Sequence, residues 1–376
     1  MSHSAPAPHR HAIVGCGRVA PFHADAFQRL AGVELALACD PLTANAEDLA
    51  ARYAIAAYCE RFEDVLANPA VTSLSIATPH DLHAPMALAA IEHGKHVLVE
   101  KPLALQGETG TAAIEAARKA GLVLMPVAQH RFDPLIARIG EMVSAGDLGE
   151  VVMVRAHLEC VRDKAYYRDS AWRGTWAREG GSVLMNQAHH LVDLLRWLGG
   201  PVRRVDAVMK TLANTDVMET EDMVAATLEF RSGASGTLSA NGAAGGEWSS
   251  FMELRGRAGI VAFDINYPNM LHRFQLADRR AMQRWRARFQ DAQQGSISAA
   301  LGRLSYYGTS HRAQARAFID AIDGRAPVEG GATAVEALEV AAIIQAIYEA
   351  ARTGRACEPR PAGAPAPEIA SDDASL

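Results

Sequence analysis

The strongest candidate for proton chemistry is Lys101, which lies between a glutamate and a proline in Glu100-Lys101-Pro102. The motif directly follows the apolar run His96–Val99. If that run is a buried parallel strand, the motif lies at the carboxyl edge of a sheet, where open α/β folds bind ligands. A partly desolvated lysine there can hydrogen-bond a hydroxyl group and exchange its proton. Oxidation of an alcohol needs that proton removed as hydride leaves the carbon.

A second polar motif lies near the middle of the chain, within residues 180–193. His190 follows Asn186 by four residues, a spacing that puts both side chains on one face of an α-helix. His80 and His83, or His189 and His190, could be considered as metal ligands. No cysteine or carboxylate completes either set, so we expect no metal site.

A glycine motif near the start predicts a dinucleotide site. Gly15, Gly17 and Ala20 form a GxGxxA pattern that follows the first apolar run and opens the first helix. Such a loop turns tightly and brings backbone amides and the helix N-terminus to a pyrophosphate. Asp40 lies 23 residues after Gly17, where a carboxylate accepts from the adenosine ribose and repels a 2′-phosphate. The expected cofactor is therefore NAD, with NADP possible; Arg18 and Val19 complete the loop.

The elements that must position these motifs alternate over residues 11–127. Apolar bursts predict buried parallel strands at Ala12–Val14, Leu35–Cys39, Leu74–Ala77, His96–Val99 and Val123–Pro126. Amphipathic segments predict helices at Ala20–Leu30, Ala44–Tyr53, His83–His93 and Glu108–Ala120. The alternation indicates an α/β fold with a doubly wound parallel sheet of the Rossmann type.

The pattern changes after Pro134. Helices are expected at Leu135–Ser144, Val183–Leu198, Ala313–Ile322 and Thr333–Ala351. Strands are expected at Val151–Glu159, Val202–Leu212, Met223–Phe230, Ala234–Ala240, Phe251–Arg255, Gly259–Phe263 and His272–Leu276. Consecutive strands joined by turns indicate an α+β domain with a large, mostly antiparallel open sheet.

Three segments are therefore expected. The first is a cofactor domain at 10–133. The second is a substrate-binding and oligomerisation domain at 134–355, whose closing helices return to the first domain. The third is a disordered Pro- and Ala-rich tail at 357–376. Five arginines at 279–288 are read as a solvated helix or a mobile insertion, with an anion site as the alternative.

Composition limits the function classes. The chain has 376 residues and a net charge of −6, which offers no general attraction for nucleic acid or anionic membranes. It has no apolar run of about 20 residues and a short polar start, so a cytoplasmic protein is expected. The five cysteines are scattered without a CxxC pair, which argues against disulfides and thiolate zinc sites.

Together these motifs resemble the Gfo/Idh/MocA oxidoreductase family over roughly residues 10–355, most specifically in the EKP motif after GKHVLV. The resemblance implies an NAD(P)-dependent enzyme in which Lys101 and His190 are the catalytic, titrating pair. It implies a cis bond before Pro102 and a hydroxyl-orienting role at position 186, where Asn186 replaces the family's frequent aspartate. The cofactor-contacting positions that it implies are Thr78, Pro79, His83, Glu100, Lys101 and Gln129. His189 occupies a packing position in the motif.

The stretches 161–167 and 171–176 resemble the branch of the family that acts on free or nucleotide-linked sugars, including UDP-N-acetylglucosaminuronate 3-dehydrogenases. Aromatic faces suit a pyranose and arginines suit a carboxylate or phosphate. Arg162, Tyr167, Arg173 and Asn186 are therefore candidate substrate contacts; a packed linker is the alternative interpretation.

The expected reaction is hydride transfer between the nicotinamide and a ring hydroxyl carbon of a sugar, sugar nucleotide or cyclitol. Two alternatives stay open, which are an NAD-dependent glycosidase on the same fold and a non-catalytic, cofactor-binding regulator. Apolar stretches such as Met223–Leu228 in an open sheet also predict a homodimer or homotetramer.

Overall fold

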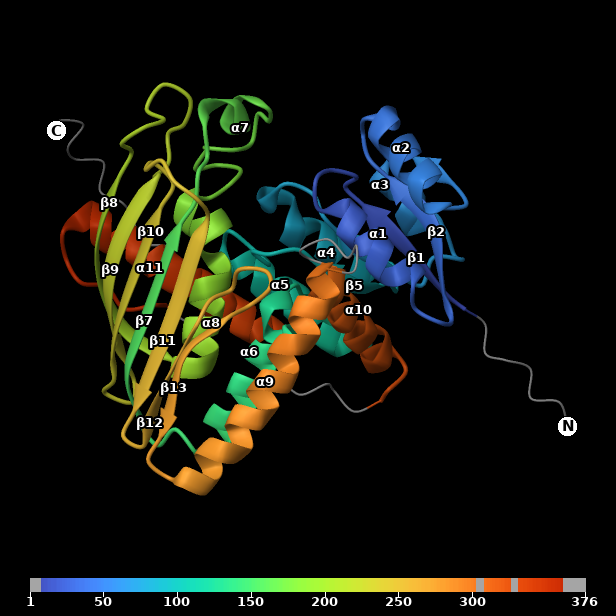
Figure 1. Cartoon of the computed structure of the whole chain (residues 1–376). Helices are drawn as coiled ribbons and strands as arrows, with labels where there is room; N and C mark the ends of the chain where they lie inside the picture. The colour runs from blue at the N-terminus through green and yellow to red at the C-terminus, as the bar shows by residue number, and fades with distance from the viewer. Residues whose placement is uncertain (1–7, 302–307, 326–330, 361–376) are drawn as a thin grey trace, which may run out of the picture.

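A six-stranded parallel sheet forms one half of the molecule (Figure 1). The structure is a computed structural model that describes residues 8–301, 308–325 and 331–360. The strand order is β3-β2-β1-β4-β5-β6, which is the Rossmann order. The strands are β1 His9–Val14, β2 Val33–Cys39, β3 Tyr58–Cys59, β4 Ser73–Ile76, β5 His96–Val99 and β6 Leu124–Pro126. The predicted fold class is confirmed for this half.

Helices cover both faces of this sheet, as its buried apolar strands require. Residues of α1, α2 and α10 share one core cluster with the sheet. Residues of α3, α4 and α5, together with the start of α11, share the other. The bounds are α1 Ala20–Gln28, α2 Thr43–Tyr53, α3 Phe62–Ala67, η1 His80–Leu82, α4 His83–Glu92, α5 Gly107–Ala120, η2 Gln129–Phe132, α10 Gly308–Ile322 and α11 Ala334–Thr353. The closing helices therefore pack against the cofactor-binding half.

The second half is a seven-stranded sheet in the order β13-β12-β11-β7-β10-β9-β8. All neighbouring strands are antiparallel except β7 and β10, which are parallel. The strands are β7 Val151–Glu159, β8 Val202–Lys210, β9 Met223–Phe230, β10 Ser235–Asn241, β11 Ser249–Gly256, β12 Gly259–Phe263 and β13 Leu271–Leu276. The predicted mostly antiparallel sheet is confirmed.

One face of the second sheet packs on helices in the largest core cluster. In Figure 1, α8 and α11 lie on this side of the sheet. The helices that contribute side chains to this core cluster are α6 Pro134–Ser144, α8 His189–Gly199, α9 Arg279–Leu301 and the long α11. The short α7 Lys164–Arg168 lies beyond the end of β7. Side chains on β9 alternate between buried and exposed, the pattern of a sheet with one face packed on a core.

The helix expected at Val183–Leu198 is interrupted, so that prediction is wrong in its first half. Residues Val183–Gln187 form a π-helical turn, and α8 begins only at His189. The carboxylate of Glu221 holds the turn by accepting hydrogen bonds from the amides of Ser182 and Leu184. The i, i+4 argument that linked Asn186 to His190 therefore does not apply.

The Arg-rich segment is a solvated helix, as expected, whereas the start of the tail differs from expectation. Residues 279–288 belong to α9, where Arg284 pairs with Asp147 and Arg288 pairs with Glu141. The predicted tail is not disordered where it begins, because Cys357 forms a β-bridge with Val205. Residues 361–376 of that tail lie outside the described residues. None of the helices that the structure describes is long and apolar enough to cross a membrane.

Candidate active site

The glycine loop has the backbone geometry that its sequence predicts. Gly15 has a φ of +86°, and a Cβ there would lie 2.6 Å from the carbonyl oxygen of Ala77. Gly17 has no atom within 4 Å of a built Cβ, so this side of the loop is open. Arg18 and Val19 are exposed beside it, and α1 begins at Ala20. A phosphate group could therefore approach the backbone at Gly17.

Asp40, after β2, is the expected ribose ligand. Its Oδ2 accepts a hydrogen bond from the amide of Cys16 at 2.9 Å, and its Oδ1 accepts one from the amide of Leu42 at 2.9 Å. Oδ1 also accepts from Nδ2 of Asn45 at 3.3 Å, so the further lone pair that stays available is on Oδ2. The carboxylate thus fixes the glycine loop and can still accept from a ribose hydroxyl.

Two buried polar atoms along the expected cofactor path have no partner among the described residues. They are the hydroxyl oxygen of Thr78 and the amide oxygen Oε1 of Gln129. Buried polar atoms are normally hydrogen-bonded, so these are vacant contacts for a bound polar ligand. Together with the open loop and Asp40, they fit a dinucleotide, with Pro79 forming the half-buried edge beside Thr78.

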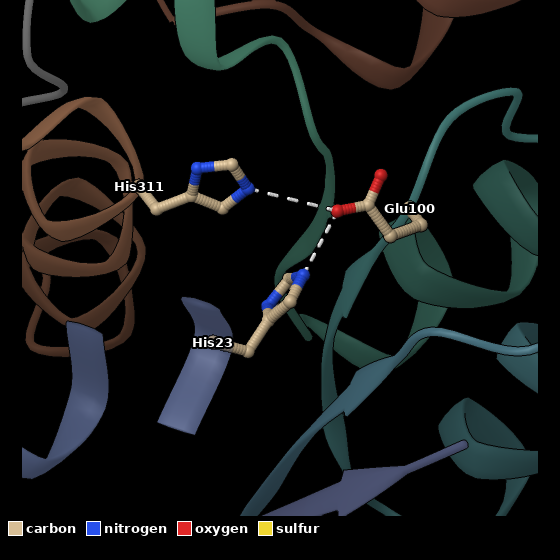
Figure 2. Close-up of side chains that lie close together, drawn as sticks. All are labelled: His23, Glu100 and His311. Carbon is tan, nitrogen blue, oxygen red and sulfur yellow. Dashed lines mark hydrogen bonds and ion pairs between the residues drawn. The ribbon is translucent and has the colours of Figure 1, made fainter. Parts of the chain in front are cut away.

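The side chains of Glu100 and His83, which we expected at the cofactor, have other contacts. Glu100 is 7% exposed, and the Nε2 atoms of His23 and His311 lie 2.9 and 3.8 Å from its Oε1 (Figure 2). Burial favours the neutral acid, but the hydrogen bonds from the two histidines outweigh it and hold the pKa of Glu100 well below its usual range. This cluster joins α1, the end of β5 and α10.

His83 is also buried, at 1% exposure. Its ring nitrogens lie 2.8 Å from the carbonyl oxygens of Pro102 and Thr78. It therefore links two loops that border the site, and the structure gives it a positioning role. The peptide bond between Lys101 and Pro102 is cis.

Lys101 and Asn186 meet in the structure, although they come from opposite halves of the molecule. The Nζ atom of Lys101 donates to both the carbonyl oxygen and the side-chain Oδ1 of Asn186, each at 2.9 Å. Burial lowers the pKa of Lys101, with Glu100 and Glu179 opposing the shift and Arg162 adding to it. A lysine held in this way is more readily deprotonated than one in water.

Glu179 is a site residue that the sequence analysis missed. Its side chain is fully buried, and its Oε1 accepts a hydrogen bond from Nδ2 of Asn186 at 2.6 Å. Burial raises its pKa to about 7, although hydrogen bonds from Gly174 and Asn186 oppose the shift. The sequence signal for Glu179 was an acid directly before Gly180-Gly181. It lies close to the motif in which Asn186 replaces the family's frequent aspartate.

His190 lies next to Gln129, with their Nε2 atoms 3.3 Å apart. Burial, followed by the nearby His130 and Lys101, holds the pKa of His190 well below its usual range. It is therefore neutral at neutral pH. We expected Lys101 and His190 to titrate as a pair near neutrality; the structure puts Glu179 in that range instead. His189 is buried, as expected of a packing residue.

The predicted substrate residues divide into two groups. Tyr167 is buried and its hydroxyl is bonded to Ser182 at 2.9 Å, so it is not a substrate contact. Its neighbour Tyr166, which we had not selected, accepts from the side-chain amides of Asn186 at 3.4 Å and Gln187 at 3.2 Å. Consecutive helical residues point in different directions, and the sequence alone did not show which tyrosine faces the site.

Three guanidinium groups surround the ring of Tyr166. The Cζ atoms of Arg173, Arg162 and Arg18 lie 4.4, 4.9 and 5.8 Å from its centroid. Arg162 also lies 5.2 Å from the ring of Trp248. The structure thus joins a cofactor-loop residue to both predicted arginines in one cationic and aromatic cluster.

Comparison with known sequences matches two family models. Residues 9–127 match "Oxidoreductase family, NAD-binding Rossmann fold", and residues 136–262 match "GFO/IDH/MocA C-terminal domain". The scyllo-inositol 2-dehydrogenase (NAD(+)) of Bacillus subtilis is 30% identical over 62% of this chain and 67% of its own length. The levoglucosan dehydrogenase of Pseudarthrobacter phenanthrenivorans is 27% identical over 58% and 62%, so the alignment spans less than two thirds of that relative.

Solved structures match nearly the whole chain. The WlbA dehydrogenase of Bordetella pertussis, in complex with NADH and UDP-GlcNAcA, is 28% identical with a TM-score of 0.84. The match covers 94% of this chain and 99% of that one. GenD2 from gentamicin A biosynthesis, in complex with NAD, is 25% identical with a TM-score of 0.76, covering 95% and 99%.

Proposed function

Because the chain belongs to the Gfo/Idh/MocA family of NAD-binding oxidoreductases, we propose that Lys101 is the base that takes the hydroxyl proton of a sugar-like substrate during its oxidation. The observation that carries this proposal is the double hydrogen bond from Lys101 to Asn186. When bound, NAD supplies the hydride acceptor. Pairing with NAD instead of NADP is favoured by the carboxylate of Asp40, which repels a 2′-phosphate.

The geometry determines what a neutral Lys101 presents to the substrate. An uncharged amine has two N–H bonds and one lone pair, and Asn186 accepts both N–H bonds. The lone pair of the amine can then accept a hydrogen bond from a substrate hydroxyl. Burial favours the neutral form, so the base is prepared before the proton is taken.

His190 orients the same hydroxyl. Its ring is neutral, because its pKa lies far below the usual range, so it can donate one hydrogen bond and accept another. Gln129 fixes the ring from one side. His190 therefore holds the substrate oxygen and stabilises charge on it, while Lys101 takes the proton.

The substrate class follows from the cluster around Tyr166. Arg18 and Arg173 share one carboxylate, that of Asp169, and Arg162 acts electrostatically on Lys101, so the cluster leaves a positive surface beside Lys101. Guanidinium groups bind carboxylates and phosphates, and the tyrosine face suits a pyranose. We infer that the substrate is a sugar or sugar nucleotide that carries an anionic group. The WlbA dehydrogenase, which was solved with UDP-GlcNAcA, supports this class.

A turnover screen tests the proposal. Purified protein is mixed with NAD or NADP and with a panel of neutral sugars, cyclitols, uronic acids and UDP-sugars, and absorbance is followed at the nicotinamide band. We expect reduction of NAD with an acidic sugar or UDP-sugar. Glycoside cleavage without net NADH would favour the glycosidase alternative, and NAD binding without turnover on any compound would favour the regulator.

We also propose that the protein is a homodimer or homotetramer that uses the outer face of the second sheet. One row of neighbouring residues on that face is small or apolar, namely Val208, Ala225 and Ser239, and Val208 is 56% exposed. A clean monomer by light scattering at micromolar concentration would contradict this. A cytoplasmic location is supported by the five cysteines, all of which are free.

A further inference from the structure

We propose that Glu179 is a positioning residue that supplies, through Asn186, the negative charge opposite Lys101. This inference rests on the proposed role of Lys101 as the base. A lysine that takes a proton becomes an ammonium in a buried site, and a buried cation needs an anion or strong acceptors. Asn186, its direct partner, is neutral. Glu179 is the acid hydrogen-bonded to that partner.

The hydrogen bonds form a continuous path with a defined direction. A carboxylate only accepts hydrogen bonds, so Oε1 of Glu179 must face the NH₂ group of Asn186, at 2.6 Å. The other end of the amide, Oδ1, must then face Lys101, where it accepts from Nζ at 2.9 Å. Glu179 therefore determines which way the amide points, and its charge polarises Oδ1 toward the lysine.

Glu100 is the neighbouring acid and its charge also opposes the lowering of the pKa of Lys101, but its carboxylate lies off the hydrogen-bond path from Nζ. Its Oε1 faces His23 and His311, and its Oε2 accepts from the main-chain amide of Lys101 at 3.2 Å. Figure 2 shows both histidine rings directed at this carboxylate. The hydrogen-bond path from Nζ to a carboxylate leads through Asn186 to Glu179.

The proton and electron balance is simple. The hydroxyl proton of the substrate moves to Nζ of Lys101, and the hydride leaves carbon for NAD, so the alcohol becomes a carbonyl. Glu179 keeps its protonation state and stabilises the ammonium that forms, much as the aspartate of a catalytic triad stabilises its imidazolium. An ionised Glu179 makes Lys101 a stronger base, and a protonated Glu179 makes it a weaker one.

Several other charged or titratable groups face Glu179. Its Oε2 accepts from the amide of Gly174, and its main-chain carbonyl oxygen lies 2.9 Å from Nδ1 of His80. The remaining groups that interact with it electrostatically are Lys101, Glu221, Tyr166, Tyr167 and Tyr348. Burial raises the pKa of Glu179 to about 7, so its charge changes in the range where activity is measured.

Two substitutions can move the negative charge from position 179 to position 186 with little change in the shape of the side chains. Glu179 accepts from two donors, Gly174 and Asn186, whereas a glutamine can accept from only one and presents a donor to the other. Glu179→Gln therefore loses the charge and also leaves two donors facing each other. In the double variant Glu179→Gln/Asn186→Asp, the new amide donates to the new carboxylate, which accepts from Lys101. The hydrogen bonds that link Gly174, residue 179, residue 186 and Lys101 are kept, and the hydroxyl of Tyr166 becomes the donor toward residue 186. The charge moves from position 179 to position 186.

The experiment compares wild type, Glu179→Gln and the double variant by two measurements. The first is kcat/KM against pH with the substrate found in the turnover screen. We expect Glu179→Gln to lose about tenfold or more and to lose the inflection near pH 7, and the double variant to recover most of the rate. The second needs neither cofactor nor substrate. It is competitive acetylation of the lysines against pH, read at Lys101 by peptide mass spectrometry, with the exposed Lys119 as the internal control.

The direction of the expected change in Lys101 follows from the charge. Loss of the anion disfavours the ammonium, so the pKa of Lys101 falls in Glu179→Gln and returns to at least its wild-type position in the double variant. An unchanged labelling curve in Glu179→Gln, or a double variant that stays as impaired as the single one, would overturn the inference. If the labelling shifts as expected while wild type oxidises no substrate, the coupling stands and the proposed function fails.

Discussion

The two glycines of the cofactor loop provide a matched pair of substitutions that separates folding from cofactor binding. Gly15 has a φ of +86°, and an added Cβ would lie 2.6, 2.7 and 2.8 Å from backbone atoms of Ala77 and Thr78. The left-handed conformation costs a non-glycine residue roughly 1–2 kcal/mol. Insertion of a methyl group into packed structure costs roughly 1–3 kcal/mol. We expect Gly15→Ala to lower the free energy of unfolding of the cofactor-free protein by about 2–5 kcal/mol.

Gly17→Ala adds the same methyl group two residues away, where no atom lies within 4 Å and φ is not positive. The unfolding free energy should stay within about 0.5 kcal/mol of wild type, because nothing in the protein is displaced. NAD affinity should fall at least about tenfold, which is about 1.4 kcal/mol, because the methyl group occupies the open side of the loop. Urea denaturation without cofactor and calorimetry with NAD measure the two effects. A Gly17→Ala protein that binds NAD normally would refute the assignment of this loop to the pyrophosphate.

Three other predictions concern the substrate side and the core. Tyr167→Phe removes a buried hydrogen bond to Ser182 and should cost about 1 kcal/mol of stability with little change in KM. Tyr166→Phe should instead lower kcat/KM with little change in stability. Steady-state kinetics and urea denaturation distinguish the two variants, and the reverse pattern would contradict our choice of Tyr166. Arg131 is 1% exposed and bonded to Asp193, so Arg131→Met should cost about 3–5 kcal/mol by denaturation. The raised pKa of Glu179, about 7, means that the folded state binds its proton more tightly than the unfolded state, so stability from this group is present at low pH and is lost as pH rises through about 7. Relative to Glu179→Gln, wild type should lose up to about 1.4 kcal/mol of unfolding free energy per pH unit between about pH 5 and 7. Parallel curves of stability against pH for the two proteins would contradict the burial of that carboxyl.

Most of the fold could be predicted from the sequence because its strands carry strong local signals. The strands at His96–Val99, Val151–Glu159, Met223–Phe230 and Gly259–Phe263 have the bounds that their apolar patterns indicate. The missed elements β3 Tyr58–Cys59, α3 Phe62–Ala67 and α7 Lys164–Arg168 are short. The wrongly predicted continuous helix at 183–198 depends on Glu221, which reaches its amides from a distant part of the sequence, and helical periodicity carries no information on such a contact.

The site could be predicted only where a motif defines it. The motifs identified Lys101 and Asn186 as candidates, whereas the hydrogen bond between them is a finding of the structure. Tyr166 lies on the five-residue helix α7, and Glu179 lies on irregular backbone between α7 and α8. Segments this short or irregular have no helical periodicity to read. The family resemblance placed Glu100 and His83 at the cofactor, but their side chains turn to His23 and to main-chain carbonyls.

The most direct test of the central claim is the rate of substrate oxidation by Lys101→Met, compared with Lys119→Met on the exposed surface of α5 as the control. Methionine keeps much of the stem and removes the group that takes the proton. Loss of a general base costs on the order of 10²–10⁴-fold in rate. We therefore expect kcat to fall by that factor in Lys101→Met, with NAD affinity nearly unchanged and Lys119→Met active as wild type. A Lys101→Met enzyme with near-normal kcat on the true substrate would contradict the account.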